Sequence, residues 1–306
     1  MRVRIHRSGV NPTDWKSRQG GAESTAVDPA QVPGQDGAGV IDAVGPGVDA
    51  ARIGRRVWIW EAAFKRAEGT TQDYALIPDV QAVDLPDDAS FDLGAGLGIP
   101  FLTAHRCLTV TEGGPERLGP GALEGRHVLV AGGAGAVGNA AIQLAHWAGA
   151  TVITTVSSAQ KAQLAAAAGA DHIINYRDTD VVAEVRRLVP KGVHTIVEVS
   201  AAQNAGIDVK VIARDGSIAM YADDGGAEVS MPIRASMGPN VRWQFVLVYT
   251  APKPAKEHAV QSVSAALADR AIRETLPLHH FALAEAAAAH QAVQDAAVGK
   301  VLIDLA

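Results

Sequence analysis

A glycine-rich turn between two apolar runs constrains the fold more than any other part of the chain. The first run, from His127 to Ala131, reads HVLVA, and the turn after it has glycines in the spacing G-x-G-x-x-G. An alanine-rich segment then continues to Gly149, and a second, β-branched run extends from Thr151 to Val156. This order predicts a strand, a tight turn, a helix and a second strand, which together form one βαβ unit.

The spacing of the glycines in this turn is typical of a dinucleotide-binding backbone. One glycine allows the turn, one lets the backbone approach a pyrophosphate, and one lets the helix pack against the strand. The helix N-terminus then presents unpaired N–H groups and a partial positive charge to the phosphates. Small residues suit any tight turn, but this turn follows a strand and opens a helix. We therefore expect phosphates to bind at Gly133, Ala134, Gly135, Ala136, Val137 and Gly138.

The end of the second predicted strand favours NADPH over NADH. Units that bind NAD usually have an Asp or Glu about 20 residues past the glycines, where it accepts hydrogen bonds from the ribose 2′-OH. This chain has Ser157, Ser158 and Lys161 instead. Two hydroxyls and an ammonium can hold a 2′-phosphate, and no carboxylate is present to repel it. The alternative is that Ser158 only caps the next helix and that Lys161 is a solvated surface residue.

Length and charge limit the organisation and the partners of the chain. Its 306 residues exceed what one hydrophobic core usually serves, so we expect two domains. The net charge of −6 and the absence of a basic stripe argue against nucleic acid as a partner. No apolar run approaches the roughly 20 residues needed to span a bilayer, and the first residues lack the apolar core of a secretory signal. A single cysteine, Cys107, can form no internal disulfide. These features predict a cytoplasmic protein without a membrane partner.

The pattern of short and long segments predicts how the domains divide. Closely spaced short strands with frequent turns dominate before the glycine turn, and α and β segments alternate after it. We therefore expect the first part of a substrate domain at 1–105, a dinucleotide-binding domain at 106–249, and a return to the first domain at 250–306. The fold class is α/β, with a doubly wound parallel sheet of about six strands in the middle segment.

Several further strings carry a family resemblance. They are GVNPTDW at 9–15, PGQDGAGV at 33–40, GIPFLTA at 98–104, Asn175-Tyr176-Arg177 and Gly299-Lys300-Val301. With the glycine turn they resemble the zinc-independent quinone oxidoreductases, the zeta-crystallin-like family of the medium-chain dehydrogenase/reductase superfamily. The resemblance implies a GroES-like β-barrel interrupted by a Rossmann domain. It also implies NADPH as the reductant and quinones or other α,β-unsaturated carbonyls as acceptors.

The resemblance also implies roles for single residues. It makes Lys161 and Tyr176 contacts of the adenosine 2′-phosphate, adds Lys300 to the cofactor-binding residues, and puts Asn11 near the nicotinamide and the substrate. One departure is that the chain is N-terminally short, because it lacks the strands with which family members usually begin. Either the start codon is misplaced, or the barrel is truncated and leaves an edge with which another chain could pair.

The same alignment predicts an enzyme without zinc. Zinc-dependent relatives use cysteine and histidine ligands at the positions that align with Asn11 and with Gln35-Asp36. A catalytic zinc needs about three protein ligands that converge on the metal. With one cysteine in the chain and asparagine at the first position, we expect no metal site.

These features predict hydride transfer from NADPH to a quinone or to the β-carbon of an enone, with the Asn11 amide stabilising the acceptor oxygen. Asn11 could instead be a turn residue that bonds its own backbone ahead of Pro12. Two other functions stay open, an enoyl-thioester reductase and a catalytically silent NADPH-binding protein.

The last apolar strand of the dinucleotide domain predicts a homodimer. It runs from Val241 to Val248, and an exposed sheet edge there could pair with its twofold copy. The alternative is that Arg242 and Gln244 keep the edge solvated.

Overall fold

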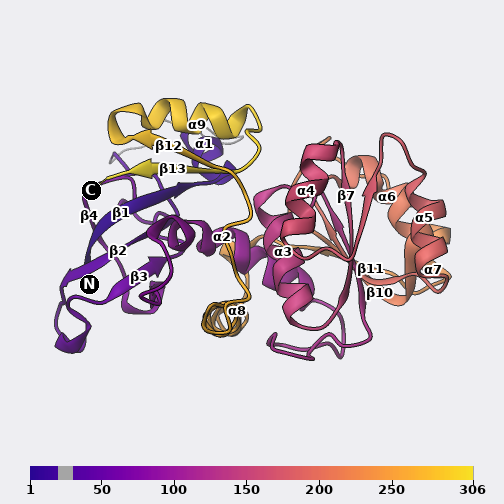
Figure 1. Ribbon diagram of the computed structural model, residues 1–306, viewed down its shortest axis with the longest axis horizontal. Helices are drawn as coiled ribbons and strands as arrows, with labels where there is room; N and C mark the ends of the chain where they lie inside the picture. Colours follow the sequence, from indigo (N-terminus) through magenta and orange to yellow (C-terminus); the bar gives the residue numbers. More distant parts are fainter. Residues whose placement is uncertain (20–29, 306) are drawn as a thin grey trace. The chain divides into compact units, whose positions relative to one another are not determined.

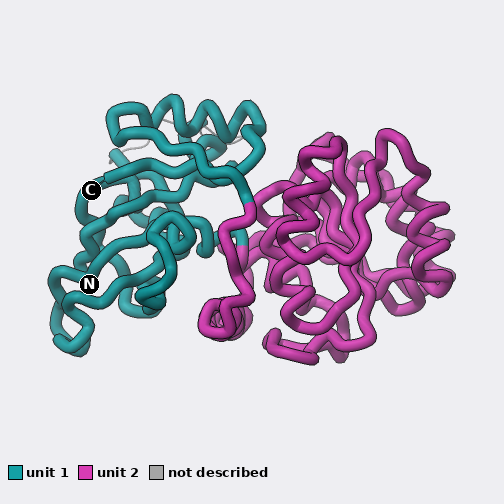
Figure 2. Tube along the Cα trace, viewed as in Figure 1, with its two compact units in different colours: residues 1–100, 276–306 teal, residues 101–275 magenta. Residues whose placement is uncertain are grey.

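The chain folds into two compact units (Figure 2). Unit 1 contains Met1–Pro100 and Leu276–Ala306, and unit 2 contains Phe101–Thr275. The structure, a computed structural model, describes residues 1–19 and 30–305. Residues 20–29 and 306 belong to the first and third predicted segments and lie outside the described residues. Among the described residues, no helix is both long enough and apolar enough to cross a bilayer.

Unit 2 is built on a six-stranded sheet with the order β11-β10-β9-β6-β7-β8, in which every neighbouring pair is parallel. The chain starts at β6 in the middle, runs outward to β8, and returns across β9 to β11 at the other edge. This is the doubly wound order that the sequence predicted. The strands are β6 (His127–Ala131), β7 (Thr151–Val156), β8 (His172–Asn175), β9 (Val193–Glu198), β10 (Ile212–Met220) and β11 (Arg242–Phe245).

Helices cover both faces of this sheet, with α3 and α4 on one side and α5, α6 and α7 on the other (Figure 1). Apolar side chains fill the space between them, and Val185, Ile196 and Ile218 are fully buried in one cluster that joins α5 to β9 and β10. The helices are α3 (Ala136–Trp147), α4 (Ala159–Ala167), α5 (Val181–Leu188), α6 (Ala201–Val211), α7 (Ile233–Met237), η4 (Val248–Thr250) and α8 (Lys253–Ala268). Helix α8, which the sequence division put in the returning segment, belongs to unit 2.

Glycines end two of these helices where the sequence predicted a stop. Gly149 follows α3 with a φ of 86°, and Gly169 follows α4 with a φ of 101°. A left-handed residue just past the last turn lets the chain leave a helix, and glycine adopts that conformation without a steric penalty. The strand and helix limits around the glycine turn are therefore encoded locally.

Unit 1 contains a seven-stranded sheet with the order β12-β13-β1-β2-β3-β5, and β4 pairs with β1 outside this path. Its core includes Val3, Ile5, Ile41 and Val57, which are all fully buried. The strands are β1 (Arg2–Val10), β2 (Asp36–Ala43), β3 (Arg56–Ile59), β4 (Tyr74–Leu76), β5 (Ala82–Asp84), β12 (Leu278–Ala282) and β13 (Lys300–Asp304). The helices are α1 (Pro12–Arg18), η2 (Ala50–Arg52), η3 (Asp79–Gln81), η5 (Leu283–Glu285) and α9 (Ala286–Gln294), while α2 (Phe91–Leu108) continues from this unit into the next.

The predicted β-barrel is corrected to an open sheet. Strands β12 and β5 are the two ends of the pairing path, so no closed barrel forms among the described residues. Strand β1 changes partners along its length, since Arg2 to Arg4 pair with β4 whereas Arg7 to Val10 pair with β13. The register of β1 with β2 is irregular in the same stretch. An extra residue in one strand bends that strand and increases its twist, which is consistent with the change of partner.

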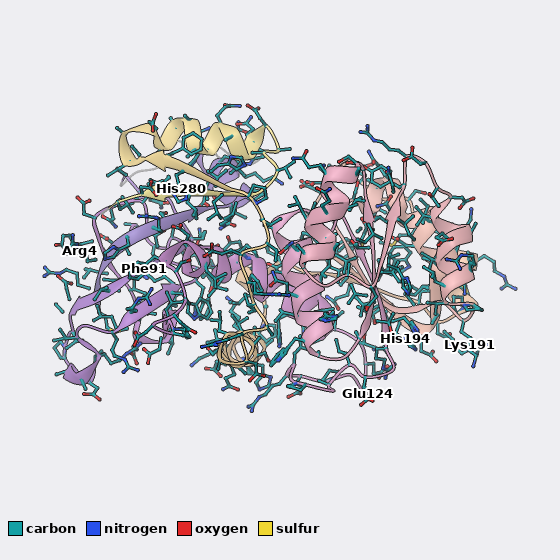
Figure 3. The ribbon with its side chains drawn as sticks, in the orientation of Figure 1. Arg4, Phe91, Glu124, Lys191, His194 and His280 are labelled. Atoms are coloured by element: carbon teal, nitrogen blue, oxygen red, sulfur yellow. The ribbon has the colours of Figure 1, made fainter. Side chains whose placement is uncertain are left out.

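The end of the chain, from Leu276, belongs to unit 1. Strand β13 pairs antiparallel with β1, and Gly9 lies opposite Leu302. The sequence did not predict β12, which pairs parallel with β13. A hydrogen bond of 2.8 Å between His280 Nδ1 and Asp304 Oδ1 joins the two strands. Figure 3 labels His280 among the side chains of unit 1.

The edge strand of unit 2 is shorter than predicted. Strand β11 ends at Phe245, although the Val246 N–H still donates to the Met220 carbonyl at 2.7 Å. The chain then forms the single turn η4 before Pro252. The predicted strand from Val241 to Val248 is therefore wrong in its second half.

Candidate functional site

The glycine turn of unit 2 has the close packing that its glycines predicted. A Cβ atom on Gly133 would lie 2.2 Å from Thr154 Oγ1, and one on Gly138 would lie 2.4 Å from the Gly132 carbonyl oxygen. The tight turn itself falls on Gly132, whose φ is 70°. Gly132 was not among the predicted phosphate-binding residues, although the doubled glycine that starts the turn was a signal for it.

Helix α3 begins directly after this turn. The Gly135 N–H donates to Gly132 O at 2.9 Å, and Gly135 O accepts from the Asn139 N–H at 2.8 Å. Gly135 is exposed, whereas Ala136 and Val137 are half-buried and Ala134 is buried. Because the first N–H groups of a helix have no acceptor within the helix, they can bind an anion at this position.

Polar side chains gather where β7 and β8 end, at the same edge of the sheet. Asn175 is paired with Val156, and the Tyr176 N–H donates to Val156 O at 3.1 Å, so Tyr176 lies beside the segment that contains Ser157. The Tyr176 side chain is 52% exposed. No Asp or Glu stands at the end of β7, which leads directly into the two serines.

Ser158 and Lys161 belong to the first turn of α4. The Ser158 hydroxyl accepts from the Lys161 N–H at 3.3 Å, which is the capping role weighed as the alternative. The Lys161 side chain is half-buried. No ion pair involves its ammonium among the residues that the structure describes, so this cation could bind an anion from outside the chain.

In unit 1, the predicted Asn11 and Lys300 lie in one buried polar cluster. Lys300 Nζ donates to Asn11 Oδ1 at 3.0 Å and to Val10 O at 3.3 Å. Asn11 Nδ2 donates to Asp36 Oδ2 at 2.6 Å, and Lys300 Nζ is 3.7 Å from the same oxygen. Asn11 is therefore held between a cation and a carboxylate.

Two aspartates complete this cluster. Asp36 Oδ1 accepts from the Ile99 N–H at 2.8 Å. Asp14 accepts from the backbone N–H groups of Asn11 at 2.7 Å and Gly34 at 3.2 Å. Asp14 thereby links the start of α1 to the loop that leads into β2. Neither carboxylate was among the predicted site residues, and the only signal for them was their position in the strings GVNPTDW and PGQDGAGV.

Burial dominates the electrostatics of the cluster. It raises the pKa of Asp36 to about 6, against the opposing effects of the Lys300 charge and the bond from Asn11. It raises the pKa of Asp14 to about 7, although the bond from the Asn11 backbone opposes it. Burial also lowers the pKa of Lys300, while the Asp36 charge acts in the opposite direction. Burial therefore moves the pKa values of the two carboxyls toward neutral pH.

Comparison with known proteins gives the family of this fold. Residues 1–87 match the family described as alcohol dehydrogenase GroES-like domain, and residues 136–265 match the zinc-binding dehydrogenase family. The quinone oxidoreductase of Rattus norvegicus is 31% identical over 229 residues, which cover 74% of this chain and 66% of the rat protein. The chain belongs to the medium-chain dehydrogenase/reductase superfamily.

Solved structures of the superfamily agree with the architecture. An NAD-dependent alcohol dehydrogenase superposes with a TM-score of 0.85 at 27% identity, covering 100% of this chain and 91% of the other. A mycobacterial protein complexed with NADPH has a TM-score of 0.80 at 26% identity, with 99% and 91% covered.

Many medium-chain dehydrogenases hold zinc, but the residues of this chain do not fit a catalytic zinc. The carboxylate of Asp36 already faces an ammonium, and the amide of Asn11 uses its oxygen and one of its two N–H groups within the cluster. The Lys300 ammonium lies 3.7 Å from the Asp36 carboxylate that accepts from the Asn11 side chain, and its positive charge repels a divalent cation from that position. Among the described residues, no group of three or more His, Cys, Asp or Glu side chains is arranged to hold a metal ion.

Proposed function

We propose that this medium-chain protein reduces quinones or other α,β-unsaturated carbonyls with NADPH and without zinc. The observation that carries this proposal is the polar edge of unit 2, where the ends of β7 and β8 offer hydroxyls, the Lys161 ammonium and the exposed Tyr176 ring, and where no acid directly follows β7. The resemblance to a quinone oxidoreductase and to a protein solved with NADPH supports it.

The residues of unit 2 fit such a cofactor. The glycines after β6 keep the turn free of side chains, and the first N–H groups of α3 can bind the pyrophosphate. Ser157 and Lys161 can bind the 2′-phosphate, and the Tyr176 ring can pack beside the adenosine. When bound, NADPH supplies the hydride. Direct cofactor binding by Lys300 stays a prediction, and its contacts suggest that it also positions Asn11.

In unit 1, Asn11 is the group proposed to act on the acceptor. Its side chain is 3% exposed and fixed at both ends, so the amide is preorganised. One N–H of Nδ2 goes to Asp36, and the other can donate to the oxygen on which charge develops. A fixed donor in a dry site stabilises such a charge more than water does. Without a Lewis acid, conjugated acceptors are better substrates than simple ketones.

The assay that tests this proposal follows absorbance at 340 nm. NADPH and NADH are each supplied with a quinone, a simple enone and an enoyl-CoA. We expect oxidation of NADPH with the quinone or the enone, and a lower apparent KM for NADPH than for NADH. Oxidation with the enoyl-CoA alone would favour an enoyl-thioester reductase. Tight binding of NADPH without turnover of any acceptor would favour a silent binding protein.

A homodimer through the β11 edge is part of the proposal. Strand β11 pairs only with β10 among the described strands, and Phe245 and Leu247 at its end are 66% and 56% exposed. Ile233 and Met237 of the neighbouring α7 are exposed as well. Edge pairing would cover these apolar groups. Light scattering after gel filtration should give twice the chain mass of 31.7 kDa, and the chain mass itself would exclude the pairing.

We also propose that the protein acts in the cytoplasm. Cys107 is a free, buried cysteine, and burial raises the pKa of its thiol. A reducing compartment maintains such a thiol.

A further inference from the structure

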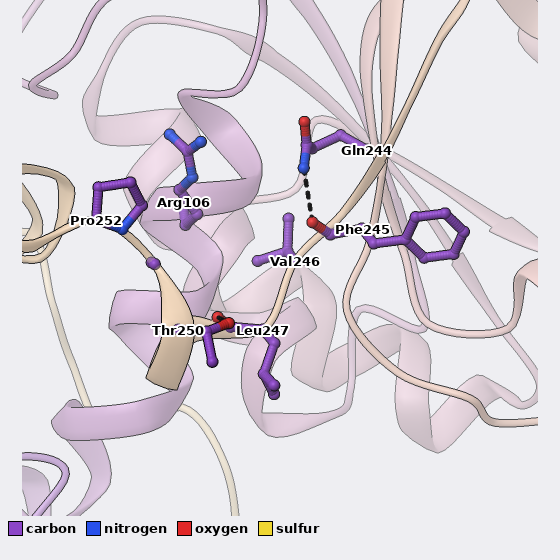
Figure 4. Close-up of a pocket in the computed structure, with 8 residues that line it drawn as sticks. Arg106, Gln244, Phe245, Val246, Leu247, Thr250 and Pro252 are labelled. Atoms are coloured by element: carbon purple, nitrogen blue, oxygen red, sulfur yellow. Dashed lines mark hydrogen bonds between the residues drawn. The ribbon is translucent and has the colours of Figure 1, made fainter.

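A small cavity lies in unit 2 where the edge strand β11 ends (Figure 4). Arg106 of α2 lines one part of it, and residues 244–247 and 250–252 line the rest. Its volume is about 140 Å³. Pockets that hold a drug-sized molecule begin at roughly 300 Å³. The cavity therefore suits one small polar group and not a quinone ring system.

Arg106 gives this cavity its charge. It is half-buried, and its guanidinium takes part in no ion pair or hydrogen bond among the described residues. Elsewhere in unit 2, Arg186 donates to the carbonyls of Lys210, Pro190 and Ile212, and Arg242 pairs with Glu112. A guanidinium has five N–H donors, so Arg106 retains an unused set of them.

Two other polar side chains of the cavity donate to the backbone. Gln244 Nε2 donates to Phe245 O at 2.7 Å, which Figure 4 shows as a dashed line, and Thr250 Oγ1 donates to Leu247 O at 3.2 Å. The lining formed by the described residues includes no carboxylate. Arg106 therefore has no counter-charge in the cavity, and a ligand that completes the site must bring acceptors.

The position of the cavity also indicates a ligand. Because all six strands of unit 2 are parallel, the end of β11 lies on the same edge of the sheet as the glycine turn after β6. In open α/β sheets, ligands bind outside the carboxyl ends of the strands. The cavity is therefore on the ligand-binding edge of unit 2.

We propose that this cavity binds a small oxyanion, a phosphate or a carboxylate, through Arg106. A planar guanidinium binds such groups with two parallel hydrogen bonds. The oxyanion could be free phosphate or the anionic group of a larger acceptor such as an enoyl-CoA. The second source rests on the proposed reductase function, whereas the site itself does not.

Thermal unfolding of the whole chain tests the site without any turnover. Inorganic phosphate is compared with chloride at equal ionic strength for the wild type, Arg106→Gln, Arg106→Lys and Arg234→Gln. Arg234 is an exposed arginine of α7 in the same unit, so its variant is a matched control. We expect phosphate to raise the Tm of the wild type and the control but not of Arg106→Gln.

Calorimetric titration with phosphate should give a Kd weakened about 10- to 100-fold in Arg106→Gln, since a hydrogen bond to a charged group contributes that much. Arg106→Lys should retain part of the affinity for phosphate. If Arg106→Gln does not fold, the Kd of Arg106→Lys is compared with that of the wild type instead. No phosphate-specific effect in the wild type, or an equal effect in Arg106→Gln, would overturn the site.

Kinetics then separate the two sources of the oxyanion. If it belongs to the acceptor, Arg106→Gln raises the KM for an enoyl-CoA about tenfold or more and leaves the KM for a neutral enone unchanged. If it is free phosphate, both KM values stay unchanged although phosphate binding is lost. An equal rise in both KM values would contradict an oxyanion site. A chain inactive with every acceptor would count against the reductase proposal, and the phosphate titration would still decide the site.

Discussion

Replacement of Lys300 by Met tests the buried polar cluster of unit 1 most directly. Methionine keeps an unbranched apolar chain but removes the ammonium that lies 3.7 Å from Asp36 Oδ2. Asp36 is 0% exposed and would keep only the bonds from Asn11 and from the Ile99 N–H. Removing one partner of a buried ion pair costs about 3–5 kcal/mol, and we expect a loss of this size in the free energy of unfolding at about pH 8.

The loss should be smaller in acid. Burial raises the pKa of Asp36 to about 6 in the presence of Lys300, and removal of the cation raises it further. A carboxyl whose pKa is raised by folding contributes stability below its unfolded pKa and loses that contribution as the pH rises through its folded pKa. At about pH 5 a proton neutralises Asp36, so only the hydrogen bonds of Lys300 are lost, at about 1–2 kcal/mol.

Urea unfolding at these two pH values measures the effect, with Lys65→Met as the control. Lys65 is an exposed residue of the same unit, and its replacement should change stability by less than about 0.5 kcal/mol. Adding Asp36→Asn to Lys300→Met should recover part of the loss at about pH 8, because the unpaired charge is removed. A loss that is the same at both pH values would refute the reasoning, since it would mean that Lys300 acts through packing alone.

Three further outcomes follow from the same contacts. Gly138→Ala should abolish NADPH binding in a fluorescence titration, because the new Cβ would lie 2.4 Å from the Gly132 carbonyl oxygen, whereas Gly206→Ala, which meets nothing within 4 Å, should bind normally. Lys161→Ala should weaken the Kd for NADPH about 10- to 100-fold and leave that for NADH unchanged, and equal changes would remove Lys161 from the 2′-phosphate site. The free energy of unfolding of Asp14→Asn, measured with urea, should rise by about 2–3 kcal/mol relative to that of the wild type as the pH increases from about 5 to about 8. The reason is that Asp14 in the folded wild type holds its proton up to a pKa of about 7. A constant difference across this range would contradict the assignment.

The local signals of unit 2 were strong enough to predict its fold. The β-branched runs that became β6 and β7 and the glycines around α3 each act within a few residues, so their pattern is visible in the chain. Unit 1 was predicted less well. Its strands β4 and β5 have three residues each, and β1 divides one edge between β4 and β13, so pairing decides its shape more than periodicity does. The barrel was therefore expected from resemblance, and an open sheet was found.

The sequence by itself determined the glycine turn, the polar residues after β7 without an acid, and the alternation of strands and helices around them, because each depends on neighbours along the chain. Only the tertiary structure decided that Lys300 bonds to Asn11 across 289 positions and that Asn11 bonds to Asp36. It also decided that Arg106 faces a cavity without a counter-charge. The physical reason is that burial and charge pairing depend on which distant segments pack together. Both shift the pKa values of side chains, and the residues adjacent in sequence do not indicate these shifts.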